Sequence, residues 1–98
     1  GPREALLTRS LTLEEINWLG DQDSLTEAAR DRLAVRIRVR STRPPTPGRL
    51  EMSGGEPFVR FDDPDEGVSP GQACVLYDHE TADRVLGGGF IRSTVAAA

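Results

Sequence analysis

The sequence predicts an all-β protein, a small closed barrel of about six strands. Residues 33–40 alternate between apolar and charged or small side chains, which is the pattern of a half-buried strand. Several further short segments are rich in β-branched residues, and glycine and proline separate them. With only one short helical pattern in the chain, this punctuation favours a barrel.

Size and composition are those of one soluble globular domain spanning residues 1–98. Hydrophobic residues make up 37% and charged residues 29%, and no apolar run approaches the ~18 residues of a membrane span. The single cysteine, Cys74, excludes an intrachain disulfide. Because the first residues also lack a secretion signal, we expect a cytoplasmic protein.

The first third of the chain predicts one strand and one helical turn. A strand is expected near Thr8–Leu13, followed by an irregular stretch anchored in the core by Trp18. Ser24 followed by Glu27 three residues later is typical of a helix start. We therefore expect a single helical turn after Ser24.

The middle of the chain predicts the alternating strand and a hairpin. Residues 33–40 form the strand, and Pro44 and Pro45 end it because they lack amide donors. Residues 49–61 are expected to form a hairpin whose tight loop contains Gly54 and Gly55. Residues 62–71 are polar and predict a long connection.

The last third predicts strands again. Residues 72–78 carry apolar side chains on both faces, which favours a strand buried on both sides. Residues 84–95 predict either two strands or one strand bent at Gly87–Gly89.

The alternating strand also holds the strongest functional pattern. Arg36, Arg38 and Arg40 stand on one face, about 6.6 Å apart, in a chain whose net charge is −4. That spacing is close to two phosphate steps along a nucleic-acid strand, and arginine binds phosphate bidentately. The alternative is a solvated face or a sheet edge protected by charge.

The loop motifs predict structure rather than chemistry. Ser53–Pro57 lacks the helix that a pyrophosphate-binding loop requires, so a hairpin turn is expected. Gly87–Gly89 lacks the Lys-Ser/Thr of a phosphate loop and predicts a bulge or a close backbone approach. Asp62–Glu66 does not match a calcium loop and predicts a solvated acidic segment.

Three single side chains have equally simple explanations. Cys74 lies among apolar residues without a base nearby, so an inert buried thiol is expected. His79 has no partner at metal-ligand spacing and predicts a surface residue. Trp18 predicts a core anchor, with base stacking as the alternative. The residues alone therefore predict a non-catalytic domain without a metal or cofactor.

Several ordered segments also carry a family resemblance. They are "NWL", "VRIRVRS", "FDDPDEGVSPGQACVLYD" and "VLGGGFI". In this order and spacing they resemble the C-terminal β-barrel of the bacterial tRNA-specific 2-thiouridylases, a family formerly described as methyltransferases. The fold implied is similar to a barrel domain of translation GTPases. The chain would then be one domain of a larger enzyme.

The resemblance implies an enzyme that uses ATP to activate the wobble uridine of tRNA and replaces its oxygen with sulfur. The ATP site, the two catalytic cysteines and the contact with a sulfur-relay donor belong to segments outside this chain, so Cys74 inherits no catalytic role. The barrel would position tRNA, and Arg38 and Arg36 match the family's basic pattern.

The expected RNA-binding residues are therefore Arg36, Arg38, Arg40 and Arg43. The alternatives are a structural module that docks on the enzyme's other domains without touching RNA, through an exposed apolar patch that includes Phe90 or Trp18, and a stand-alone barrel with an interior ligand pocket.

Overall fold

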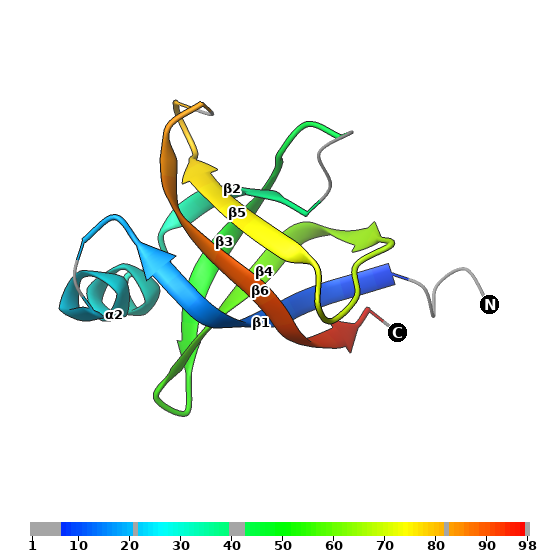
Figure 1. The fold of residues 1–98 in the computed structure, drawn as a ribbon, viewed down its shortest axis with the longest axis horizontal. Helices are drawn as coiled ribbons and strands as arrows, with labels where there is room; N and C mark the ends of the chain where they lie inside the picture. The colour runs from blue at the N-terminus through cyan, green and yellow to red at the C-terminus, as the bar shows by residue number, and fades with distance from the viewer. Residues whose placement is uncertain (1–6, 21, 40–42, 82, 98) are drawn as a thin grey trace.

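Six antiparallel strands close into a barrel in the order β1-β4-β3-β2-β5-β6 (Figure 1). The computed structural model describes residues 7–20, 22–39, 43–81 and 83–97. The elements are β1 (Leu7–Trp18), α2 (Gln22–Arg30), β2 (Ala34–Arg38), β3 (Thr46–Ser53), β4 (Glu56–Glu66), β5 (Ala73–Asp78) and β6 (Val85–Ala96). This architecture confirms the predicted all-β closed barrel.

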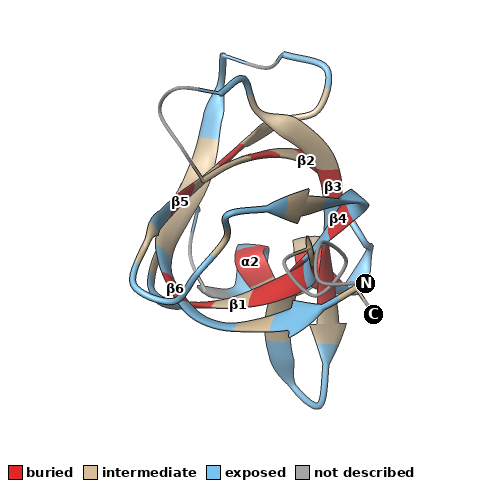
Figure 2. Cartoon of the chain, turned by 90° about the vertical axis from the view of Figure 1, so that its right-hand side faces the viewer, coloured by how far each residue is buried: buried red, intermediate tan, exposed pale blue. Residues whose placement is uncertain are grey.

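The barrel interior is filled by side chains. Every strand contributes buried apolar residues, among them Leu11, Ile37, Val59, Leu76 and Ile91, each at most 2% exposed. Figure 2 looks into the barrel and colours the buried stretches of the strands red, with α2 at the far end. The packed core leaves the outer face of the sheet as the surface on which a function is built.

The strand β1 is longer than predicted. It continues to Trp18 through the stretch that the sequence indicated to be irregular. Its pairing with β6 shifts at three places, and Glu15 has a positive φ of 53°. Each bulge reverses which face the following side chains occupy, so period-2 alternation is lost although the backbone remains extended. Trp18 is half-buried and packs against the core, as predicted.

The helix α2 is also longer than the single turn expected after Ser24. It spans nine residues, begins before Ser24 and buries Leu25 and Ala29, which are 3% and 0% exposed. These two positions are one helical turn apart and face β3 and β4, where packing stabilises turns that propensity alone would not. Within the described residues, no helix is long and apolar enough to cross a membrane.

The hairpin of β3 and β4 forms as predicted, with Gly54 and Gly55 at φ of 56° and 80°. Its second strand, however, runs on to Glu66, so residues 62–66 are not part of a connection. Leu7 and Thr8 of β1 pair with Glu66 and Asp65 there. Backbone pairing needs no apolar side chain, which explains why this part of the strand is polar.

The structures of β5 and β6 test the predictions made for residues 72–78 and 84–95. Cys74 and Leu76 are buried, but Ala73 on the opposite face is exposed, so β5 is buried on one side only because the barrel has one interior. The second of the two alternatives for residues 84–95 is correct, since β6 is one strand. At Gly87 an added Cβ would lie 2.5 Å from the Asn17 carbonyl oxygen, which confirms a close backbone approach.

Candidate nucleic-acid interface

The arginine stripe lies on the outer face of β2. Val35 and Ile37 point into the core, being 0% and 2% exposed, and Arg36 and Arg38 alternate with them on the other side. The extended geometry and the shared face are therefore confirmed for these two residues. Arg40 lies outside the described residues.

The surroundings of β2 remove one of the two structural alternatives. It pairs with β3 on one side and with β5 on the other, so it is not a sheet edge. Charge on this strand cannot serve to guard an open edge. The stripe is therefore either a solvated face or a binding face.

Arg36 is anchored to the neighbouring loop. Its Nε donates to the carbonyl oxygen of His79 at 2.9 Å, where β5 has just ended. Arg38 is half-buried and also has a partner. These contacts restrict the side chains to the outer face, which reduces the conformational entropy they would lose on binding a phosphate.

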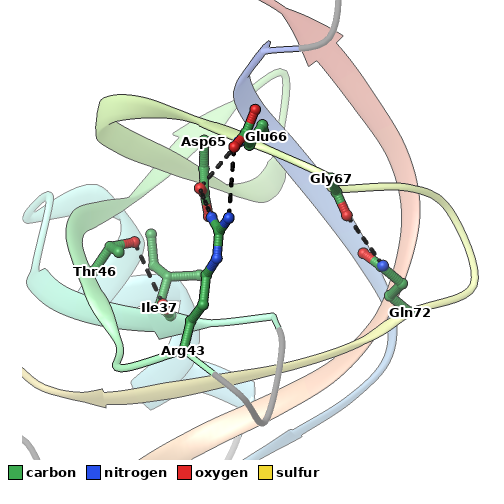
Figure 3. A network of polar contacts seen from close by, with 7 residues as sticks. All are labelled: Ile37, Arg43, Thr46, Asp65, Glu66, Gly67 and Gln72. Atoms are coloured by element: carbon green, nitrogen blue, oxygen red, sulfur yellow. Dashed lines mark hydrogen bonds and ion pairs between the residues drawn. The ribbon is translucent and has the colours of Figure 1, made fainter.

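Arg43 does not continue the stripe. Its Nη1 and Nη2 lie 3.5 Å from Asp65 Oδ1 and Glu66 Oε1, at the end of β4 (Figure 3). A phosphate would have to compete with two carboxylates for this guanidinium. RNA contact by Arg43 stays a prediction, and the structure gives it a weaker basis than it gives Arg36.

The neighbouring strands add basic residues that the sequence analysis missed. Ala34 of β2 pairs with Arg49 of β3, which pairs with Arg60 of β4, so both arginines stand in one row beside the stripe. Neither residue belongs to an alternating pattern. The signal was in the predicted hairpin, because a two-residue loop at Gly54–Gly55 fixes the register that brings Arg49 opposite Arg60.

The loop motifs have structural roles in the fold. Ser53 is the last residue of β3, and Gly54–Gly55 form the turn, as predicted. Asp62 and Asp63 are exposed, as expected of a solvated acidic segment. No group of three or more potential metal ligands occurs among the described residues.

Two further side chains that could be reactive, those of Cys74 and His79, are buried or half-buried. Burial raises the pKa of the Cys74 thiol to about 12, so the thiol remains protonated at neutral pH, as predicted for a core cysteine. His79 is half-buried rather than a fully exposed loop residue, and its Nδ1 has no partner within the described part of the chain. The backbone carbonyl oxygen of His79 accepts the hydrogen bond from Arg36 Nε.

Comparison with known proteins places this barrel in a family. Residues 8–91 match the model of the aminomethyltransferase β-barrel domain, and the chain belongs to that family. It is 66% identical over 94 residues to the tRNA-specific 2-thiouridylase MnmA of Caulobacter vibrioides, covering 96% of this chain and 24% of that protein. Identity to the corresponding protein of Hyphomonas neptunium is 63% over 97 residues, covering 99% and 24%.

These matches confirm the predicted resemblance to the C-terminal barrel of the tRNA-specific 2-thiouridylases. The chain spans about a quarter of the length of the curated relatives it matches.

Proposed function

We propose that the chain is the tRNA-positioning barrel of a 2-thiouridylase that modifies the wobble uridine. The curated relatives are named for thiolation of tRNA. The observation that carries the proposal is the outer face of β2, where Arg36 and Arg38 stand side by side in a chain of net charge −4, with further arginines in the row beside them. Local charge, not the total, governs attraction to a polyanion.

Arginine side chains on a sheet suit the phosphate backbone better than bases. Their guanidinium groups stand at fixed spacings on a rigid surface and donate two parallel hydrogen bonds to a phosphate. Such contacts set the position and orientation of the RNA but carry no sequence information. A barrel with this face holds a tRNA in place while other parts of the enzyme recognise the wobble uridine.

The chemistry belongs to the remainder of the enzyme in this proposal. ATP activation of the uridine carbonyl, sulfur transfer by the catalytic cysteines and contact with the sulfur-relay donor would all take place there, in the cytoplasm. Within this chain, the buried and protonated Cys74 thiol is unsuited to persulfide transfer, since the thiolate is the reactive form.

Salt-dependent binding of a tRNA transcript tests the proposal. We expect the Arg36→Gln/Arg38→Gln variant to lower the log–log salt slope by about 0.7–0.9 for each phosphate that is no longer bound. Arg92→Gln is the matched control, because Arg92 pairs with Glu56 and lies on β6, two strands from β2 around the barrel. Equal slopes for the parent, the β2 variant and the control would refute the role of the stripe.

A second candidate function has its own observation. Phe90 and Val85 of β6 are 45% and 49% exposed, beside a shallow hollow of about 330 Å³ that Gly88, Ala73 and Val75 also line. This apolar face adjoins the basic one, because Val75 of β5 pairs with Arg38 of β2. We infer that it docks on the other domains of the same polypeptide, which make up three quarters of the curated relatives.

The two candidates differ in what the isolated chain does. If docking is the whole function, the chain binds no tRNA at low salt and self-associates through the apolar face. Phe90→Ser should then restore a monomer in analytical ultracentrifugation. A monomeric parent chain that binds tRNA would instead favour positioning over docking alone.

A further inference from the structure

A second group of arginines surrounds one buried carboxylate where α2 meets the sheet. Glu51 of β3 has a side chain only 11% exposed, and its two oxygens each meet a guanidinium group. Oε1 lies 3.0 Å from Arg32 Nε, and Oε2 lies 3.1 Å from Arg60 Nε. The side chains of Arg32 and Arg60 are 64% and 49% exposed, so the Glu51 carboxylate lies beneath the two guanidinium groups.

The two contacts differ in quality. The Arg32 contact is an aligned hydrogen bond, whereas Glu51 Oε2 is buried without an aligned hydrogen-bond donor and has Arg60 only within ion-pair distance. Arg60 also lies over the Phe58 ring, 5.9 Å from its centroid. Arg60 is therefore held between an aromatic face and a carboxylate.

Arg32 occupies a backbone position that favours glycine. It follows α2 with a φ of 56°, and the helix ends there with bonds from Arg32 N to Ala29 O and from Leu33 N to Ala28 O, at 3.2 and 3.0 Å. This is the Schellman end of a helix, whose left-handed residue is usually glycine. An arginine kept in that conformation indicates a use for its side chain, since strained residues gather at functional positions.

The third arginine is tied to the same loop. Arg49 Nη1 donates to the carbonyl oxygen of Arg32 at 2.9 Å. The group therefore holds three guanidiniums and one carboxylate. One arginine is enough to neutralise a buried carboxylate, so the other two exceed what burial of Glu51 requires.

We propose that Arg32, Arg49 and Arg60 form a phosphate-binding centre for the RNA backbone, with Glu51 as the residue that positions them. The inference rests on the proposed tRNA-positioning function and extends it beyond the β2 stripe. Each ion pair engages Nε, and the Nη groups supply the donors for a phosphate. Glu51 pre-organises two guanidiniums that would otherwise lose conformational entropy on binding.

Glu51→Gln tests the positioning role by the sign of its effect. The substitution makes the chain more positive, so simple attraction predicts tighter binding of a tRNA transcript. The positioning role predicts weaker binding, by about five- to eightfold at about 100 mM salt, because one bound phosphate contributes about 0.7–0.9 to the log–log salt slope. Tighter binding would overturn the role assigned to Glu51.

Variants of the arginines test the centre itself. Arg32→Gln/Arg60→Gln should lower the log–log salt slope by about 0.7–0.9 for each phosphate that the centre no longer binds. Arg32→Gly removes the guanidinium where glycine suits the backbone, so it should keep the fold by circular dichroism and lower the slope by about 0.7–0.9. This variant decides the question even if Glu51→Gln does not fold.

The outcomes separate the inference from the proposed function. If the cluster variants keep the parent slope while Arg36→Gln/Arg38→Gln lowers it, the centre is refuted and tRNA positioning stands. If the parent chain binds no tRNA, the proposed function fails and this inference with it. A lower slope in the cluster variants, with Arg92→Gln unchanged, supports both.

Discussion

Among the glycines of β6, Gly88 leaves the least room for an added Cβ, and replacing it with alanine tests how closely the strands pack there. It pairs with Val75 of β5 and with Asn17 of β1. An added Cβ would lie 2.4 Å from the Cys74 carbonyl oxygen. Real Cβ contacts are essentially never shorter than 3.0 Å, so 3.0 − 2.4 = 0.6 Å of movement is required. The obstructing atom is backbone, and the strand itself must move.

The expected loss of stability follows from this movement. Overpacking of a closely fitted site typically costs about 1–3 kcal/mol. Alanine loses less conformational freedom than glycine on folding, which offsets about 0.5–1 kcal/mol of this cost. We expect Gly88→Ala to lower the free energy of unfolding by about 2 kcal/mol, because the added Cβ would push β5 and β6 apart where Gly88 pairs with Val75. Out of a total of about 5–15 kcal/mol, this lowers Tm by about 8–16 °C.

Thermal unfolding followed by circular dichroism measures the effect. Val95→Ala is the control, since Val95 is on the same strand but 52% exposed, and its truncation should change the free energy of unfolding by about 0.5 kcal/mol or less. If Gly88→Ala unfolds within about 2 °C of the control, the close approach of the strands does not require glycine and the reasoning is wrong.

Three further predictions use single side chains. Because the folded Cys74 thiol keeps its proton to about pH 12 and the unfolded thiol loses it near 9.0, the free energy of unfolding should fall by up to about 1.4 kcal/mol per pH unit between these values. Urea titrations at increasing pH should show this fall in the parent and not in Cys74→Ala. Leu25→Ala should cost about 2–5 kcal/mol in the same titration by undocking α2. Arg43→Gln should lower the salt slope of tRNA binding less than Arg36→Gln does, because two carboxylates compete for Arg43; an equal or larger change would contradict this.

The strand β2 shows why part of this fold was predictable from sequence. A barrel strand has one inner and one outer face, and in β2 no bulge interrupts the alternation of Val35 and Ile37 with Arg36 and Arg38. The strand β1 shows the limit, since its three register shifts hide the pattern while the backbone stays extended. Bulges depend on pairing with a distant strand, which local sequence does not encode.

The same distinction between local and long-range information applies to the candidate site. The stripe of β2 was predictable because its residues are neighbours in sequence. The group around Glu51 joins the end of α2 with β3 and β4, and it depends on how the helix packs and on the register of the hairpin. The one local indication of this group is that Arg32, not glycine, occupies the left-handed position after the helix. This indication can be recognised only once the end of the helix is known.

The closure of the barrel also joins its two ends. Ala97 N donates to Leu7 O at 3.0 Å, and Thr8 pairs with Ala96, so the first and last strands are adjacent along their shared edge. The path of the described residues from Leu7 to Ala97 is therefore nearly circular. A short peptide joining Ala97 to Leu7, with new termini opened at the exposed Gly54–Gly55 turn, would preserve every strand pairing described here and change the order of the elements in sequence without altering the barrel.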